Sequence, residues 1–146
     1  MSKTVWMFPG QGAQKAGMAK DFYENSTLAR QLFDEADAAL DFDLKDTCFE
    51  ENEQIHLTEY TQPCLVTACL AMAAELRKRG FRPDMTAGLS LGEYCALVAA
   101  GVMTADDAIR TVRERGILMQ EAVPAGVGGM SAVLGMTADE ILAKLK

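Results

Sequence analysis

Ser90 is the residue whose surroundings most suggest chemistry, because it lies between two glycines in the run Gly88-Leu89-Ser90-Leu91-Gly92. Small residues two positions before and after a serine permit the tight strand-to-helix turn that holds a nucleophilic serine in a strained backbone conformation. The spacing alone does not separate a nucleophile from a serine that caps a helix. The segments on either side of the turn must decide between these two interpretations.

Those segments have the character that the turn requires. Residues 85–89 are predicted to form a short strand, and residues 91–100 a helix that is apolar nearly all round. The backbone N–H of Leu91 is then expected to point where a substrate carbonyl oxygen gains negative charge, which the helix dipole also favours. We therefore interpret Ser90 as a nucleophile. Glu93, in the first turn of the same helix, is predicted to be stabilised by the dipole rather than to act as a triad acid.

The remaining elements predict an α/β fold with parallel strands, because strands alternate with helices along the chain. The expected elements are strands at 4–8, 85–89 and 131–134 and helices at 18–25, 27–40, 61–79, 91–100, 104–121 and from 137 onward. Residues 41–59 are expected to be polar and irregular, with a single helical turn near 44–49. The first strand reads as buried. The long helix is predicted to carry Pro63 in its first turn, where proline is tolerated.

Two helices show further signals. In the helix at 27–40, Leu28, Leu32, Ala36 and Leu40 recur every four residues and are expected to form its apolar stripe. The last helix opens with Thr137-Ala138-Asp139-Glu140, which is the pattern of a capping box.

The composition of the chain argues against several classes of protein and of binding site. The chain has 146 residues, enough for one domain, and its net charge of -7 argues against nucleic acid as a partner. Its four cysteines form no Cys-x-x-Cys pair and the single histidine has no cysteine nearby, so neither a metal site nor a disulfide framework is expected. No apolar run reaches the ~20 residues that cross a membrane. We expect a cytoplasmic protein with reduced thiols.

Four separated motifs occur in order along the chain. They are Phe8-Pro9-Gly10-Gln11-Gly12-Ala13-Gln14, Thr61-Gln62-Pro63, Gly88-Leu89-Ser90-Leu91-Gly92-Glu93-Tyr94 and Arg115-Gly116-x-x-Met119-Gln120. Together they resemble the malonyl-CoA:acyl-carrier-protein transacylases of fatty acid synthesis and the related acyltransferase domains of polyketide synthases. The resemblance runs from end to end of the chain.

The resemblance implies a hydrolase-like parallel-sheet core with a nucleophile elbow, and an activity. Ser90 would take the malonyl group of malonyl-CoA as an ester and pass it to the phosphopantetheine thiol of an acyl carrier protein. Gln11 would complete an oxyanion hole with the Leu91 N–H, Gln62 would line the pocket, and Arg115 would hold the malonyl carboxylate. No bound cofactor is implied. From the residues alone, Gln11 also fits a surface loop and Gln62 a capping or solvated position.

Periodicity gives separate support for Arg115. With ~100° per residue, the apolar stripe of its helix is centred near Val112; Arg115 lies ~60° from that centre, whereas Arg110 lies ~160° away and faces water. A charged residue that borders the buried face needs a partner, which is either a carboxylate of the protein or one of a ligand.

A general base for Ser90 is missing from the sequence. The resemblance implies a histidine well downstream, in a segment that this sequence lacks, and His56 matches no family motif and is expected in a solvated loop. The resemblance also implies a ferredoxin-like subdomain inserted after the Arg115 helix. Residues 1–126 are therefore interpreted as the N-terminal part of the core, and residues 127–146 as the first strand and helix of that subdomain. The missing C-terminal half is then an expected partner.

Three alternatives remain open at this point. The first is an acyltransferase of the polyketide type. The second is a serine esterase of the α/β-hydrolase class, which shares the turn but leaves the glutamine loop and Arg115 unexplained. The third is an inactive product that serves as a binding module or as half of a split enzyme, which the absent histidine motivates.

Overall fold

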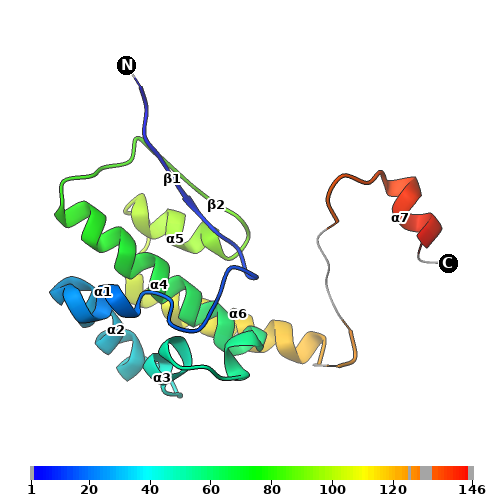
Figure 1. Cartoon of the computed structure of the whole chain (residues 1–146), viewed down its shortest axis with the longest axis horizontal. Helices are drawn as coiled ribbons and strands as arrows, with labels where there is room; N and C mark the ends of the chain where they lie inside the picture. The colour runs from blue at the N-terminus through cyan, green and yellow to red at the C-terminus, as the bar shows by residue number, and fades with distance from the viewer. Residues whose placement is uncertain (1, 125, 129–132, 145–146) are drawn as a thin grey trace.

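The structure is a computed structural model that describes residues 2–124, 126–128 and 133–144. Helices dominate it, with two short strands lying side by side (Figure 1). The elements in chain order are β1 Val5–Phe8, α1 Lys20–Asn25, α2 Thr27–Ala39, α3 Leu44–Phe49, the 3₁₀ turn η1 Gln54–His56, α4 Thr58–Lys78, β2 Met85–Gly88, α5 Gly92–Ala99, α6 Ala105–Ala122 and α7 Ala138–Lys144.

β1 and β2 form a small parallel sheet, in which Val5 pairs with Met85 and Phe8 with Gly88. The α/β class with parallel strands is thereby confirmed in its coarse form. The expectation that the first strand is buried is wrong, because Met7 is 80% exposed and Val5 is 42% exposed. Side chains alternate across a strand, so these two share one face of β1, and nothing in the described residues packs over that face. Only Phe8, on the other face, is buried.

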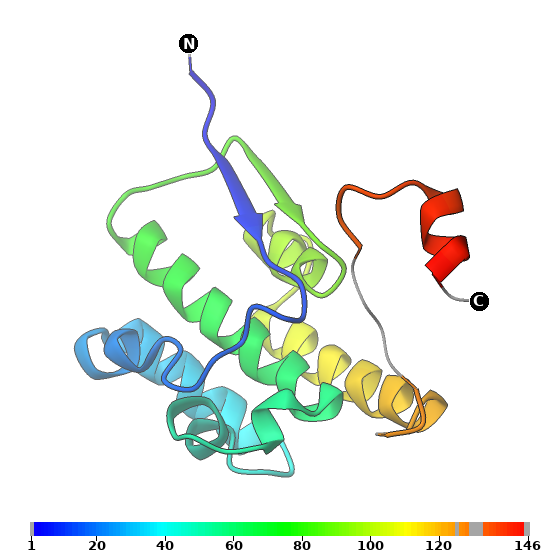
Figure 2. The same ribbon diagram turned by 45° about the vertical axis from the view of Figure 1, so that its right-hand side comes forward.

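The long helix α4 passes through the middle of the molecule and is covered by α2, α5 and α6 (Figure 2). It begins at Thr58, three residues before the predicted start, so Pro63 lies in the second turn rather than the first. Proline has no N–H to donate to the carbonyl four residues earlier, which is that of Glu59. That carbonyl oxygen instead accepts a hydrogen bond of 2.8 Å from Nη1 of Arg113 on α6. The helix ends before Gly80, which has a φ of 90°.

The buried face of α2 differs from the predicted stripe. Ala29, Phe33 and Ala36 are buried, whereas Leu28 is 40% exposed. A strict spacing of four residues drifts around an α-helix by ~40° at each step, while the spacing of four and then three residues returns to the same face. Leu28, Leu32 and Leu40 are therefore not the centre of the buried stripe.

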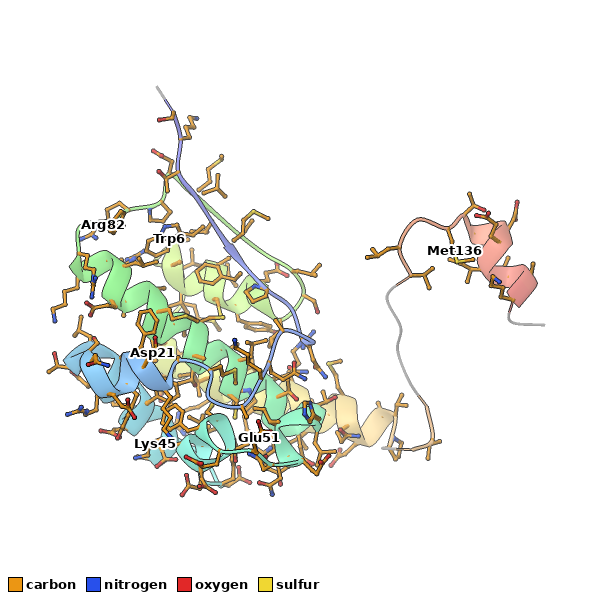
Figure 3. All side chains as sticks on the ribbon, viewed as in Figure 1. Trp6, Asp21, Lys45, Glu51, Arg82 and Met136 are labelled. Atoms are coloured by element: carbon orange, nitrogen blue, oxygen red, sulfur yellow. The ribbon has the colours of Figure 1, made fainter. Side chains whose placement is uncertain are left out.

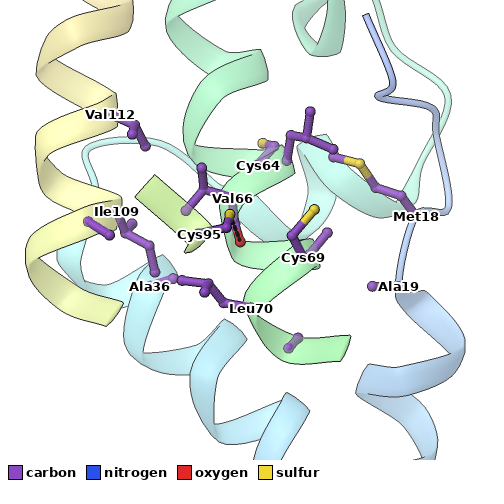
Figure 4. Packing of buried hydrophobic residues seen from close by; sticks show 14 of the residues in the cluster. Met18, Ala19, Ala36, Cys64, Val66, Cys69, Leu70, Cys95, Ile109 and Val112 are labelled. Atoms are coloured by element: carbon purple, nitrogen blue, oxygen red, sulfur yellow. Dashed lines mark hydrogen bonds between the residues drawn. The ribbon is translucent and has the colours of Figure 1, made fainter. Parts of the chain in front are cut away.

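The core lies where α4 meets its neighbouring helices. Figure 4 shows Val66 and Leu70 of α4 close to Ile109 and Val112 of α6, with Ala36 of α2 beside them. No helix in the described ranges is long and apolar enough to cross a membrane. Of the charged residues labelled in Figure 3, Asp21 of α1 and Glu51 are exposed, and Lys45 of α3 forms ion pairs with Asp34 and Asp37 of α2.

The C-terminal elements agree in part with expectation. Thr104 caps α6 by accepting a hydrogen bond from the Asp107 N–H, as predicted. The capping box of α7 is confirmed, because Glu140 accepts from the Thr137 N–H at 2.7 Å and Thr137 Oγ1 accepts from the Glu140 N–H. The first half of the strand predicted at 131–134 cannot be compared with the structure, because 131 and 132 lie outside the described residues. Its last two positions, 133 and 134, are not in a strand.

Candidate active site

Ser90 occupies a tight turn between β2 and α5. Its φ of 51° is in the left-handed region, which L-residues other than glycine adopt at a cost of about 1–2 kcal/mol. The two flanking glycines make the turn possible, because a Cβ on Gly88 would lie 2.1 Å from the carbonyl carbon of Gly92. Backbone strain of this kind is typical of functional positions and persists only where the surroundings enforce it.

The loop after β1 lies directly against this turn. A Cβ on Gly92 would lie 2.3 Å from the Phe8 carbonyl oxygen, and a Cβ on Gly10 would lie 2.9 Å from the Leu89 carbonyl oxygen. The Leu89 N–H also donates to the Phe8 carbonyl at 3.1 Å. The parallel pairing of β1 and β2 explains this contact, because both strands end at the same edge of the sheet (Figure 2). The glutamine loop and the serine turn therefore meet.

Arg115, on α6, contacts Ser90 directly. Its Nη2 donates to Ser90 Oγ at 3.1 Å and its Nη1 donates to Gln62 Oε1 at 2.7 Å. The guanidinium carbon also lies 5.9 Å from the ring centre of Tyr94. Among the described residues no carboxylate forms an ion pair with Arg115. Its partners are neutral, so its positive charge is not compensated within this part of the chain.

Two glutamines extend the hydrogen-bonded set away from Arg115. Gln62 is completely buried in α4, and its Nε2 donates to Gln11 Oε1 at 3.4 Å and to the Met119 sulfur at 3.3 Å. The side chain of Gln11 in turn donates to Thr58 Oγ1 at 3.0 Å. The structure thus joins Gln11, Gln62, Arg115 and Ser90 in one chain of hydrogen bonds. Neither a solvated position nor a helix cap describes Gln62.

The start of α5 lies next to Ser90 in sequence and space. Leu91 is 1% exposed, and its backbone N–H donates no hydrogen bond within the described ranges. An unpaired N–H at a helix start is a donor for an anion or a polarised carbonyl oxygen. Glu93 is exposed in the first turn of the helix, where a carboxylate is stabilised by the dipole.

A general base is not found beside Ser90 in the part of the chain that the structure describes. His56, the single histidine, is exposed at the end of η1, and the hydrogen bonds of the described residues do not link it to Ser90. This position agrees with a solvated histidine.

Arg113 is the important residue that sequence reasoning missed. It is 9% exposed, forms ion pairs with Asp41 at 2.9 Å and Glu59 at 3.2 Å, and lies 5.0 Å from the ring centres of Phe42 and Tyr60. Its position four residues after Ile109 and three before Gly116 places it on the buried stripe of α6. That spacing was a signal available in the sequence, but a charged side chain on an apolar stripe is easily assigned to the surface.

Gly116 allows α6 to approach α4 closely beside this cluster. A Cβ there would lie 2.8 Å from the Glu59 Cα and 2.9 Å from the Thr58 carbonyl oxygen. Gln120, one turn later, accepts from the Thr58 N–H at 3.2 Å. These contacts hold α6 against the first turns of α4, in the part of α6 that carries Arg115.

Comparison with known proteins gives a consistent set of relatives. Residues 5–144 match the family model described as the acyl transferase domain. The chain is 50% identical over 142 residues to the malonyl CoA-acyl carrier protein transacylase of Bacillus subtilis, covering 97% of this chain and 45% of the relative. A transacylase from Staphylococcus aureus is 49% identical over the same length. The chain thus spans about half the length of the curated relatives that it matches.

Solved structures show the same likeness. The malonyl CoA-acyl carrier protein transacylase of Clostridium perfringens superposes with a TM-score of 0.86 at 40% identity, covering 97% of this chain and 45% of the other. A malonyl-transacylase in complex with its type II polyketide synthase acyl-carrier protein superposes with a TM-score of 0.79 at 42% identity, covering 86% of this chain and 41% of the other.

Proposed function

Because this chain belongs to the family of acyl transferase domains, we propose that it forms the nucleophile-bearing part of a malonyl-CoA:acyl-carrier-protein malonyltransferase of fatty acid biosynthesis. The observation that carries the proposal is the contact between Arg115 and Ser90 Oγ, in which an arginine with only neutral protein partners lies beside a strained serine. That pairing suits an acyl group that carries its own carboxylate.

In the first step, Ser90 Oγ attacks the thioester carbonyl of malonyl-CoA and forms an ester as the CoA thiol leaves. The carbonyl oxygen becomes negative in the transition state, and the Leu91 N–H, together with Gln11, stabilises it there. The close approach of Gly10 to Leu89 supports this role for Gln11, because it brings the loop to the serine turn.

Arg115 holds the malonyl carboxylate. The planar guanidinium binds a carboxylate through two parallel hydrogen bonds and keeps its charge at any working pH. Gln62 orients this guanidinium by accepting from Nη1, and its own amide is fixed by Gln11 and Met119. In the second half-reaction, the phosphopantetheine thiol of an acyl carrier protein attacks the ester and releases Ser90.

No base for the serine proton lies beside Ser90 among the described residues, so we place it in residues outside this chain. We assign it to the missing C-terminal half, which is either a continuation of the polypeptide or a second chain. The uncovered face of β1 supports a missing neighbour, because Met7 and Val5 are apolar and exposed there. Within the chain we assign residues 1–126 to the hydrolase-like core with its nucleophile elbow, and residues 127–146 to the start of a ferredoxin-like subdomain. In Figure 1 α7 lies apart from the helices packed around α4, which supports a separate unit after α6.

The test is formation of the acyl-enzyme. The chain is co-expressed with the part of the Bacillus subtilis relative that it does not match, and the complex is incubated with labelled malonyl-CoA. We expect label on Ser90 in the unaltered chain and in a Ser2→Ala control, and none in Ser90→Ala. Equal labelling of Ser90→Ala would overturn the proposal. An esterase would release free malonate without carrier protein, and an inactive binding module would form the complex without taking label.

A further inference from the structure

Thr58, the first residue of α4, lies at the far end of the hydrogen bonds that reach Ser90. Its Oγ1 accepts from Gln11 Nε2 at 3.0 Å, and its N–H donates to Gln120 Oε1 on α6 at 3.2 Å. A Cβ on Gly116 would lie 2.9 Å from its carbonyl oxygen. The backbone of Thr58 is thus fixed between α4 and α6, while its hydroxyl binds the loop after β1. The steps of the proposed acyl transfer do not use this residue.

The direction of these hydrogen bonds is set from the other end, by Arg115. A guanidinium can only donate, so the atom of Gln62 that it meets at 2.7 Å is the carbonyl oxygen Oε1. The amide nitrogen of Gln62 therefore faces Gln11 and donates to its Oε1 at 3.4 Å. The amide nitrogen of Gln11 is then the atom that faces Thr58, where an acceptor is required. A hydroxyl supplies that acceptor, and an aliphatic side chain cannot.

The Gln11 side chain is the tether of a loop with few other hydrogen bonds. Of residues 9–14, only Gln11 hydrogen-bonds another element of the described chain. The N–H of Gly12 binds within the loop, to Gln14 Oε1, and Gly12 has a φ of 111°. Gln11 itself is exposed. Its position therefore depends on what its amide group binds.

We propose that Thr58 is a positioning residue for the oxyanion hole, because its Oγ1 accepts from Gln11 and thereby holds the glutamine loop against the serine turn. The inference rests on the nucleophile and the oxyanion hole of the proposed function, in which Gln11 and the Leu91 N–H stabilise the negative oxygen. Donors of this kind are effective when they are in place before the charge develops. Thr58 acts through Gln11 and is assigned no contact with the substrate.

The contact between Gln62 and Arg115 should survive loss of the Thr58 hydroxyl. Gln62 is completely buried, and its Nε2 donates to the Met119 sulfur at 3.3 Å as well as to Gln11. Its Oε1 thus keeps facing Arg115 when one end of the Gln11 amide is released. Two properties are therefore separated: the rate of acylation depends on Thr58, whereas the preference for a carboxylated acyl group does not.

The test measures the rate constant for acylation of Ser90 by labelled malonyl-CoA in the co-expressed complex. Thr58→Val removes the acceptor and keeps the shape, Thr58→Ser keeps the acceptor, and the control Thr27→Val changes the exposed first residue of α2. At saturating malonyl-CoA, Thr58→Val should lower the rate constant by on the order of 10-fold, less than the roughly 10²–10³-fold cost of losing an oxyanion donor itself. The other two variants should match the unaltered chain. The half-saturating concentration and the preference over acetyl-CoA should not change in Thr58→Val.

Two further readouts separate positioning from a purely structural role. The amplitude of acylation reports how much of the protein is folded and active, so a variant that merely folds less completely loses amplitude and keeps its rate constant. Gln11→Ala, on an exposed loop, should slow acylation at least as much as Thr58→Val does. Adding Thr58→Val to Gln11→Ala should slow it no further, because the two residues act through one hydrogen bond.

A neutral fluorophosphonate probe distinguishes this inference from the proposed function. Ser90 Oγ displaces its fluoride, the negative charge develops on the phosphoryl oxygen, and no malonyl group is needed. If the probe labels the unaltered chain and malonyl-CoA does not, the proposed function fails, and the effect of Thr58→Val is measured with the probe instead. The role of Thr58 is overturned if Thr58→Val reacts at the unaltered rate, if Thr58→Ser is slowed as much as Thr58→Val, or if Thr58→Val slows the Gln11→Ala chain as much as it slows the unaltered one.

Discussion

Two arginines on α6, only two residues apart, have opposite surroundings. Arg113 is buried, bound to Asp41 through two hydrogen bonds of 2.9 and 3.0 Å, paired with Glu59 and placed beside two aromatic rings. Arg115 is half-buried, and its hydrogen-bond partners are the neutral groups of Gln62 and Ser90. The same helix thus uses one arginine to hold itself to α4 and presents another with its charge uncompensated.

The difference teaches which arginine is available to a ligand. A buried guanidinium must be paired, and for Arg113 the carboxylates of the protein satisfy that requirement. Arg115 meets only amide and hydroxyl oxygens, so a ligand carboxylate is the partner that would complete its surroundings. Of the partners that sequence reasoning left open for Arg115, a protein carboxylate is not found among the described residues.

The largest effect on stability is expected for Arg113→Met. The change removes the ion pairs and leaves the Glu59 carbonyl without a donor, because Pro63 cannot supply one, and it should lower the free energy of unfolding by ~2–3 kcal/mol. Urea unfolding measures the loss. The control is Arg110→Met, which breaks an exposed pair with Asp106 and should cost about 0.3 kcal/mol. Equal losses in the two variants would break the comparison.

Gly116→Ala tests the closeness of α6 to α4. Intrinsic helix propensity alone would make alanine more stable by about 1 kcal/mol. The added Cβ, however, would meet backbone atoms of Thr58 and Glu59 that cannot move aside, so we expect a net loss of ~1–2 kcal/mol. A lower urea midpoint shows that the steric clash outweighs the gain in helix propensity, and a higher midpoint shows the reverse. A stabilised variant would show that the two helices are not held as described.

Arg115→Met should cost less stability than Arg113→Met. The main penalty is that the buried Gln62 Oε1 loses its donor, which amounts to ~1 kcal/mol. The same urea experiment therefore sharpens the comparison between the two arginines. If Arg115→Met destabilises the fold as much as Arg113→Met does, Arg115 is a structural residue and its free charge has no functional meaning.

The smallest expected effect is on the stability of the fold at acid pH. Hydrogen bonding to Arg113 lowers the pKa of Asp41 from its ordinary value of 3.8. A carboxyl whose pKa is lowered on folding contributes stability above the unfolded value, and this contribution is lost as the pH falls from about 3.8 through the folded value. Carboxyl NMR titration should place Asp41 below 3.8 in the unaltered chain. In Arg113→Met the pKa of Asp41 should return to about 3.8. If the pKa of Asp41 is the same in both proteins, the ion pair between Asp41 and Arg113 is contradicted.

Sequence reasoning predicted the local features well where one short segment determines them. The cap at Thr104, the capping box at Thr137, the helix end before Gly80 and the glycines around Ser90 were all predicted, because each depends on neighbouring residues. At the predicted turn, the backbone of Ser90 has a φ of 51°, which lies in the left-handed region.

Features that depend on distant partners could not be predicted. The start of α4 was misplaced because the signal read from Pro63 assumed that a proline must lie in the first turn. The hydrogen bond that Pro63 cannot donate to the Glu59 carbonyl is instead donated by Arg113, which is 50 residues after Pro63 in the chain. The hydrogen bonds among Gln11, Gln62 and Arg115 likewise join three elements, and no spacing within one segment contains them. The open face of β1 arises because the described sheet has only two strands.

The most direct test of the account measures how fast Ser90 is acylated by malonyl-CoA and by acetyl-CoA in the co-expressed complex, with the unaltered chain, Arg115→Ala and the control Arg110→Ala. Loss of a paired charge costs about 3 kcal/mol, so the preference for malonyl-CoA should fall by on the order of 100-fold in Arg115→Ala and stay unchanged in Arg110→Ala. A preference that survives in Arg115→Ala would contradict the claim that its uncompensated charge selects a carboxylated acyl group.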